Sequence, residues 1–202
     1  MKIDKSRGLC FNSSVVKKEK RGRLMAIDWT ILDGIQKIFG GSFMDWLMPK
    51  ITVLGNGGIV WIIIAVCLIL TKKHRKAGFL VLIGMLLGLI IGNGILKNAI
   101  ARSRPCWINK DWQMLISIPK DYSFPSGHTQ ASVIAVTILT LYKKKWGIVV
   151  IPLTVIIAFS RLYLYVHFPT DVLGGALLGL IIGLFTYYVG NKIIEARIYS
   201  KK

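Results

Sequence analysis

The sequence predicts an all-α integral membrane protein, a helical bundle of about five transmembrane helices with interfacial helices at its N-terminal end. Hydrophobic residues make up 53% of the 202-residue chain and the mean hydropathy is +0.57, which is more apolar than an ordinary soluble domain. The apolar residues gather in runs of about 20, the length that a helix needs to cross the hydrocarbon core of a bilayer. Short basic turns separate several of these runs, as in the cytoplasmic loops of membrane proteins.

The first 24 residues form a basic segment without apolar periodicity. This segment carries eight Lys or Arg residues against Asp4 and Glu19, a composition that favours disorder. We therefore divide the chain into a disordered tail, residues 1–24, and a single membrane domain, residues 25–202. The tail has no apolar run long enough for a signal peptide, and Met25 is a hypothetical alternative start that the intact mass would test.

Two short helices are predicted at the membrane surface before the first span. Between Ile27 and Phe39 the apolar residues recur at helical spacing, and polar residues such as Asp28 fill the other face. An amphipathic helix of this kind lies in the interface and does not cross the bilayer. Residues 42–48 form a second predicted interfacial piece, which Pro49 is expected to stop.

Five apolar segments of suitable length follow. The predicted spans are 51–70, 77–96, 126–142, 147–164 and 172–190. Glycines recur every four residues in the second and fifth spans, a spacing that indicates close helix packing and not chemistry. Asn56 and Asn93 are expected to form hydrogen bonds between helices.

The basic turns set the predicted orientation. Segments 71–76 and 143–145 and the C-terminus are short and basic, so the positive-inside rule places them in the cytoplasm. Segments 97–124 and 165–171 then meet on the extracellular side of a multi-pass plasma-membrane protein. An odd number of spans also places the N-terminus outside, where a basic tail is unexpected. Either the tail is not native or residues 27–50 enter the membrane more deeply.

The net charge of +18 has a membrane explanation. The basic residues flank apolar spans, where they anchor cytoplasmic loops and attract anionic lipid. We therefore expect the lipid bilayer as a partner and no nucleic acid. Nothing in the sequence indicates an oligomeric state.

The first polar cluster on the external side runs from Lys97 to Pro105. Lys97 and Arg104 are seven residues apart, two helical turns, so they share a face if the helix continues to Pro105. Because Pro105 disfavours a helical conformation for Arg104, the helix is expected to end there. Two cations at a helix end suit a phosphate, although such residues are also common at the membrane interface without a ligand.

The second cluster is Pro125-Ser126-Gly127-His128, directly before the third span. Proline and serine are typical of a helix start, and a helix N-terminus with a serine hydroxyl binds anions readily. Gly127 leaves the backbone N–H groups open. His128 would lie in the first turn, beside a bound anion, and the alternative is a purely structural histidine.

The third cluster, Ser160–Asp171, interrupts the apolar C-terminal region. Arg161 adds a third cation, and Asp171 lies in the first helical turn after His167, from where a carboxylate can orient the imidazole. On residue chemistry alone His167 is a nucleophile or a base. In the alternative interpretation, Asp171 only caps the helix and Arg161 only extends to the interface.

These three clusters are identified as the signatures of a known family. Lys-x6-Arg-Pro, Pro-Ser-Gly-His and Ser-Arg-x5-His-x3-Asp resemble the three motifs of the type 2 phosphatidic acid phosphatase superfamily, without a departure at their key positions. The resemblance covers about residues 27–197.

The resemblance implies a phosphatase mechanism. His167 is the expected nucleophile, Asp171 orients it, and His128 is the expected proton donor to the leaving oxygen. The residues expected to bind the phosphate are Lys97, Arg104, Arg161, Ser126 and Gly127. We expect no cofactor and no metal, since three cations supply the charge and the sequence offers no cluster of carboxylates.

The resemblance leaves the substrate open. Its composition separates the chain from the soluble haloperoxidase branch, and the short 105–124 connection favours a lipid phosphate over a large soluble substrate. Undecaprenyl pyrophosphate is the preferred expectation, with phosphatidylglycerophosphate and phosphatidic acid as alternatives. The rival of another class is a non-catalytic membrane protein that binds lipid phosphate.

Overall fold

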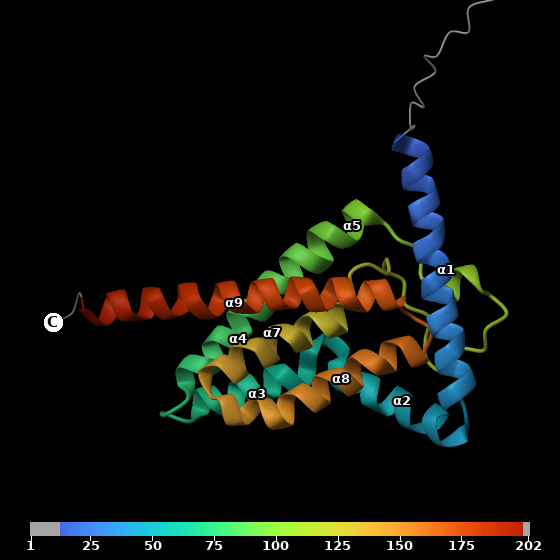
Figure 1. The fold of residues 1–202 in the computed structure, drawn as a ribbon. Coiled ribbons are helices and arrows are strands. Elements are labelled where there is room, and N and C mark those ends of the chain that lie inside the picture. The colour runs from blue at the N-terminus through green and yellow to red at the C-terminus, as the bar shows by residue number, and fades with distance from the viewer. Residues whose placement is uncertain (1–12, 200–202) are drawn as a thin grey trace, which may run out of the picture.

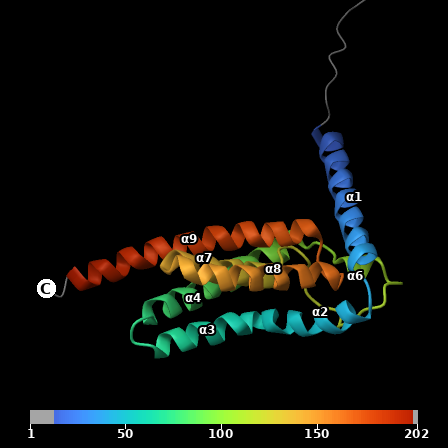
Figure 2. The ribbon, with the colours of Figure 1, turned by 60° about the horizontal axis from the view of Figure 1, so that its bottom comes forward.

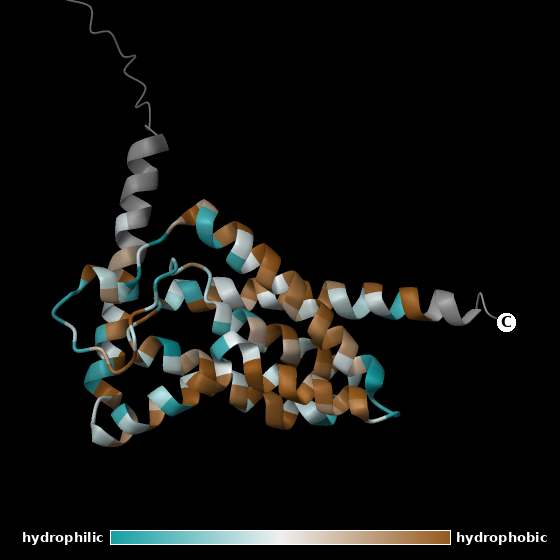
Figure 3. Ribbon diagram, turned by 180° about the vertical axis from the view of Figure 1, so that it is seen from behind, coloured by the Kyte–Doolittle hydropathy of each residue, from teal (hydrophilic) through white to brown (hydrophobic). Residues whose placement is uncertain are grey.

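Long helices run side by side in the computed structural model, and one helix lies across an end of this bundle (Figure 1). The structure describes residues 13–199, and the residues described contain no strand, which confirms the predicted all-α class. Apolar residues dominate the long helices, whereas polar residues concentrate at the turns and at the end that carries the long loops (Figure 3). This distribution is that of a helical membrane protein.

The helices of the bundle correspond to the five predicted spans. Four segments are long and apolar enough to cross a membrane: Ser42–Leu70, Arg75–Ile108, Lys144–Tyr163 and Pro169–Ile194. The remaining predicted span is α7 (Gly127–Tyr142), whose 16 residues correspond to about 24 Å of helix. It packs against α3, α4, α8 and α9 and so forms the centre of the bundle.

The first span is a broken helix, α2 (Ser42–Gly55), η1 (Asn56–Gly58) and α3 (Ile59–Leu70). The prediction that Pro49 stops a separate interfacial piece is wrong, because Pro49 lies inside α2. Membrane helices tolerate proline where packing partners compensate for the lost hydrogen bond. The break comes instead at η1, where Gly57 and Gly58 have φ of 58° and 71°, values that glycine adopts at little cost.

The second span also changes its geometry along its length. It consists of α4 (Arg75–Gly88), the π-helical η2 (Leu89–Leu96) and α5 (Lys97–Ile100). The expectation that the helix continues to Pro105 is wrong, since Ala101 turns out of the helix with φ 48°. Lys97 and Arg104 therefore do not share a helix face. A short helix, α6 (Pro105–Ile108), and a loop over residues 109–126 then lead to α7.

The last two spans are α8 (Gly147–Tyr163), which follows η3 (Lys144–Trp146), and α9 (Pro169–Tyr199). The glycines of α9 lie against α7, as predicted. A Cβ on Gly175 would come within 2.6 Å of the Ser126 carbonyl oxygen, and one on Gly179 within 2.7 Å of the Gln130 carbonyl oxygen. Close contact of the two backbones thus depends on these glycines.

Helix α1 (Ser13–Phe39) crosses the end of the bundle where α8 and α9 meet (Figures 1 and 2). Its amphipathic character is as predicted, but the face that packs on the bundle includes the polar Asp28 beside Leu32, both fully buried. Ile27 and Ile38 are exposed, 50% and 73%. Part of the predicted apolar stripe therefore faces outward, where lipid can cover it, while Leu32 packs on the bundle.

The structure describes only part of the predicted tail, residues 1–24. Residues 1–12 lie outside the described residues, and α1 begins at Ser13. The division of the chain into a tail and a membrane domain stays a prediction.

Candidate active site

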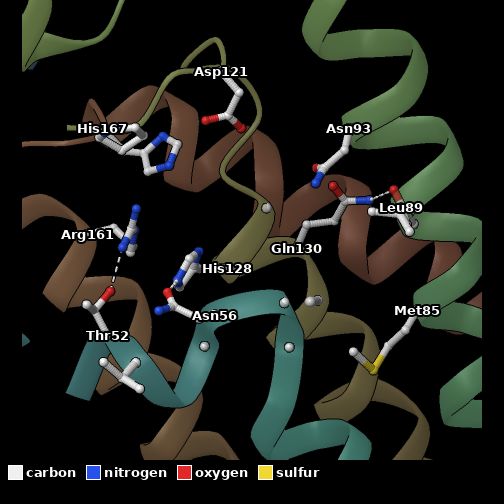
Figure 4. Close-up of a pocket in the computed structure, with 18 of the residues that line it drawn as sticks. Thr52, Asn56, Met85, Leu89, Asn93, Asp121, His128, Gln130, Arg161 and His167 are labelled. Atoms are coloured by element: carbon white, nitrogen blue, oxygen red, sulfur yellow. Dashed lines mark hydrogen bonds between the residues drawn. The ribbon is translucent and has the colours of Figure 1, made fainter. Parts of the chain in front are cut away.

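The three sequence clusters meet at one cavity of about 900 Å³. Figure 4 shows His128, Arg161 and His167 around it. Six of the eight predicted site residues line it: Lys97, Arg104, Gly127, His128, Arg161 and His167. They come from α5, the residue before α6, α7, α8 and the turn between α8 and α9, so folding brings together residues that are far apart in the chain.

His167 lies in the turn that joins α8 to α9. Its side chain is 2% exposed, and Nε2 is 3.2 Å from Nη1 of Arg104. A guanidinium group can only donate, so Nε2 is the acceptor and the ring proton is on Nδ1. The unprotonated Nε2 is the nitrogen that a nucleophile must offer, and it lies next to the cations of the cavity.

The electrostatic surroundings keep the His167 imidazole neutral. Burial first, and then the positive charges of Arg104, Arg161 and Lys97, hold the pKa of His167 well below its ordinary value. A neutral ring at neutral pH retains its lone pair.

Asp171 stands behind His167 and does not line the cavity. Its Oδ2 accepts hydrogen bonds from the Phe168 N–H at 2.8 Å and the Ser123 hydroxyl at 2.5 Å, and lies 3.6 Å from Nδ1 of His167. Asp171 therefore does cap α9, and the same oxygen also faces the imidazole. The carboxylate is held in the place from which it can orient His167 and stabilise a positive ring.

Arg161 points into the cavity with unused donors. It is 4% exposed, and its Nη1 donates to the Thr52 hydroxyl at 2.5 Å. Its Nε has no hydrogen-bond partner among the described residues. A buried guanidinium with a free N–H is incomplete without an acceptor such as a phosphate oxygen.

Lys97 and Arg104 are instead occupied by one acid of the loop before α7. The Asp121 carboxylate pairs with the Lys97 ammonium through Oδ2 and with Nη2 of Arg104 through Oδ1 at 2.8 Å. Burial alone would raise the pKa of Asp121, but the hydrogen bonds and charges of Lys97 and Arg104 outweigh it and lower the pKa to about 2. Asp121 thus holds the two cations as a phosphate would.

Arg104 has no spare donor in this arrangement. Its five N–H groups face the Asp121 carboxylate, the Asp121, Tyr122 and Val166 carbonyl oxygens, and Nε2 of His167. A phosphate that binds Arg104 must therefore displace at least part of the loop.

His128 occupies the first turn of α7, as predicted, and points toward the helix break in the first span. Its Nε2 is 2.9 Å from Oδ1 of Asn56 (Figure 4). A Cβ on Gly55 would lie 2.5 Å from the His128 ring, so the glycine gives the imidazole its space. The predicted interhelical role of Asn56 is thus a contact with a candidate catalytic residue.

Two predicted site residues, Ser126 and Asp171, do not line the cavity. Ser126 is fully buried, and its hydroxyl lies 3.0 Å from the Thr129 hydroxyl and 3.5 Å from the Thr129 N–H, where it caps α7. Gly127, the next residue, does line the cavity. Ser126 therefore shapes the N-terminus of α7, and its hydroxyl does not face the cavity.

Several residues that contact the predicted site residues were not assigned from the sequence, among them Asp121, Ser123, Asn56 and Thr52. Asn56 carried a usable signal, a polar residue between glycines inside an apolar run. Asp121 and Ser123 belong to an irregular loop and have no periodicity that would place them. Among the described residues no group of three His, Cys, Asp or Glu side chains could hold a metal ion, and a metal-independent reaction stays a prediction.

The other half of the cavity is apolar. It extends from the cations to a wall formed by side chains of α3, η2 and the second half of α4. These are Ile62, Leu82, Met85, Leu86 and Leu89. Ile62, Leu86 and Leu89 are 39%, 57% and 56% exposed, so this apolar wall is not closed off by other side chains of the protein.

Comparison with known proteins gives the class. A model of the PAP2 superfamily matches residues 77–195. Phosphatidylglycerophosphatase B of Bacillus subtilis is 32% identical over 183 residues, 83% of this chain and 77% of that protein. An undecaprenyl-diphosphatase of Sulfolobus acidocaldarius is 36% identical over 121 residues, 59% of this chain and 58% of that protein. The chain belongs to the PAP2 superfamily.

A solved structure agrees with this assignment. The crystal structure of a transmembrane PAP2-type phosphatidylglycerolphosphate phosphatase from Bacillus subtilis superposes with a TM-score of 0.69 and 28% identity, over 85% of this chain and 88% of that chain. Fold and relatives together define an integral-membrane phosphatase of the PAP2 superfamily, a hydrolase of phosphate esters.

Proposed function

We propose that this protein is a metal-independent lipid phosphatase that hydrolyses undecaprenyl pyrophosphate to undecaprenyl phosphate at the extracellular face of the membrane. The reaction passes through a phosphohistidine on His167. The observation that carries the proposal is the lining of the cavity, in which a cationic, histidine-bearing end continues into an apolar end with exposed side chains. A phosphate attached to a long hydrocarbon fits both ends at once.

The first chemical step transfers the phosphoryl group to His167. Nε2 of His167 attacks phosphorus, the N–P bond forms, and the bond from phosphorus to the leaving oxygen breaks. Lys97, Arg104 and Arg161 bind the equatorial oxygens, with the N–H groups at Gly127 as further donors. His128 gives a proton to the leaving oxygen, and Asp171 stabilises the positive charge on the His167 ring.

The second step releases the phosphate. His128, now neutral, takes a proton from a water molecule, the water oxygen attacks phosphorus, and the N–P bond breaks. His167 returns to its neutral form and inorganic phosphate leaves. Positioning and charge stabilisation account for the catalysis of both steps, and the residues named above are of the types that these two effects require.

A second substrate deserves equal testing because of one comparison. The relative that aligns with 83% of this chain is named a phosphatidylglycerophosphatase, and the relative named an undecaprenyl-diphosphatase aligns with a shorter part. Phosphatidylglycerophosphate and phosphatidic acid also combine a phosphate with apolar chains, so the cavity accepts them in principle. A panel that compares phosphate release from polyprenyl pyrophosphate, phosphatidylglycerophosphate and phosphatidic acid decides among them.

The proposed orientation rests on the distribution of charge. The basic turns at residues 71–76 and 143–145 lie at one end of the bundle, and the turn between α8 and α9, which carries His167, lies at the other end (Figure 1). The positive-inside rule then places the site outside. Labelling of Lys110→Cys by a membrane-impermeant maleimide in intact cells, in a background with the native cysteines replaced, tests this. Labelling only after lysis would contradict it.

The mechanism is tested with purified protein in detergent. His167→Ala is expected to abolish phosphate release while the protein keeps its unfolding midpoint, and excess EDTA is expected to leave the wild-type rate unchanged. Undiminished turnover by His167→Ala would refute the mechanism. Binding of lipid phosphate without turnover on any substrate would favour the non-catalytic alternative.

A further inference from the structure

A fully buried acid of the interfacial helix α1 has no part in the mechanism above. Asp28 is 0% exposed, and its Oδ1 accepts a hydrogen bond from the Thr170 N–H at 3.0 Å. Its Oδ2 accepts from the Thr170 hydroxyl and from Nη2 of Arg102, both at 2.6 Å. A buried carboxylate is costly unless it is paired, so these contacts fix α1 on the first turn of α9.

Arg102 connects this acid to the candidate catalytic carboxylate. Its Nη1 donates to Oδ1 of Asp171 at 2.6 Å, while its Nη2 holds Asp28. The guanidinium carbon also lies 4.3 Å from the centre of the Phe168 ring. One guanidinium therefore bridges two buried carboxylates, with a side-chain exposure of 21%, and an aromatic ring supports it from one side.

This bridge determines how Asp171 can face His167. With Oδ1 bound to Arg102, the other oxygen, Oδ2, is the one left for Ser123, the Phe168 N–H and Nδ1 of His167. Rotation of the carboxylate would break the contact with Arg102. Neither Arg102 nor Asp28 lines the cavity, so any effect on the reaction passes through Asp171.

We propose that Asp28 and Arg102 are positioning residues for phosphoryl transfer, through which helix α1 fixes the Asp171 carboxylate and thereby the reactive tautomer of His167. The proposal rests on the roles of His167 and Asp171 in the proposed function. In this proposal the interfacial helix α1 contributes to the active site, because its Asp28 binds Thr170 in the first turn of α9.

The expected effect separates chemistry from substrate binding. Residues that orient a functional imidazole through an intermediate group typically contribute about 10- to 100-fold to activity. Asp28→Asn keeps the size of the side chain and the acceptor for the Thr170 N–H but removes the charge that faces Arg102. We expect kcat to fall about 10-fold in Asp28→Asn and about 100-fold in Arg102→Gln, with KM unchanged in both.

The matched control is Asp33→Asn on the same helix. Asp33 is exposed and lies 3.3 Å from the Tyr165 hydroxyl, away from Arg102. This variant changes the charge of α1 by the same amount, and its kcat and unfolding midpoint are expected to match those of the wild type.

The experiment measures kcat and KM of the purified full chain on the lipid phosphate that the wild type hydrolyses fastest, together with the unfolding midpoint. The double variant Asp28→Asn/Arg102→Gln should be no slower than Arg102→Gln alone, because both changes break one chain of contacts. Arg102→Lys should recover part of kcat, since an ammonium can still reach Asp171.

Two outcomes overturn the inference. One is a kcat of Asp28→Asn within twofold of the Asp33→Asn control. The other is a loss of activity that follows the fraction of folded protein in each variant. A failure of the mechanism itself is recognised separately, because His167→Ala would then remain active whatever Asp28→Asn does.

Discussion

Removing the charge of Asp121 should make the site bind phosphate analogues more tightly. In the structure this carboxylate occupies the Lys97 ammonium and one edge of the Arg104 guanidinium. A phosphate group that uses the same two cations must first displace it. Asp121→Asn keeps the shape of the side chain and removes the competing charge, so the perturbation isolates the competition.

The size of the effect follows from the exposure of the acid. The Asp121 side chain is 54% exposed, so solvent screens both ion pairs and each contributes about 0.2–1 kcal/mol. Relief of both corresponds to roughly 0.4–2 kcal/mol, which is about a 2- to 30-fold gain in affinity. The gain should shrink as ionic strength rises, since the cations are then screened from the phosphate as well.

Inhibition of phosphate release by orthovanadate, a phosphate analogue, provides the assay. Inhibition constants are compared for the wild type, Asp121→Asn and the control Asp111→Asn, an exposed acid of the same loop. The control reports any general effect of loop charge. Equal or weaker inhibition of Asp121→Asn at low salt would refute the reasoning, because Asp121 would then support the cations and not compete for them.

Three further predictions concern the histidines and the packing. The pKa of His167 should lie below the ordinary value of about 6.5, because burial and nearby cations lower it. NMR of the ring signals in detergent, assigned with His167→Gln, measures it, and a midpoint at or above that value would contradict the electrostatic account. Asn56→Ala should lower kcat about 10-fold, the equivalent of one hydrogen bond of about 1–1.5 kcal/mol to the His128 ring, and an unchanged kcat would show that the contact is incidental. Gly179→Ala should lower the free energy of unfolding by about 1–3 kcal/mol through overpacking, measured by thermal unfolding. Gly34→Ala, with nothing within 4 Å of the added Cβ, should be neutral or slightly stabilising, and an equal loss in both would rule out overpacking as the cause.

The sequence predicted the residues whose chemistry is rare in a membrane. Two of the chain's three histidines and the cations Lys97 and Arg161 stood out because charge is costly in apolar surroundings. For the same reason the turn that carries His167 could be assigned before the structure was known. These residues line the cavity as expected, although the route of the chain between Lys97 and Arg104 differs from the predicted helix.

Residues positioned by irregular backbone could not be predicted in the same way. Ser123 and Asp121 contact site residues only because the loop before α7 folds back over the cavity. The course of this irregular loop has no periodic pattern in the sequence from which it could be predicted. The burial of Asp28 in α1 could not be predicted for a related reason. An isolated helix shows which residues share a side, but the burial of Asp28 depends on Arg102, which lies 74 residues away in the chain.

The cations of this site have opposite consequences before and after phosphate binds. In the free enzyme their field lowers the pKa of His167 and so preserves the lone pair on Nε2. A bound phosphate neutralises that field, which would raise the proton affinity of the ring at the moment when the nucleophile is needed. In the proposed mechanism, in-line contact of Nε2 with phosphorus takes the place of a proton, and the positive charge on the ring would lie next to Asp171 Oδ2, 3.6 Å from Nδ1. This mechanism requires that Arg102 hold Asp171 without cancelling its charge, and the inferred role of Asp28 meets that requirement, because one positive charge is divided between two carboxylates.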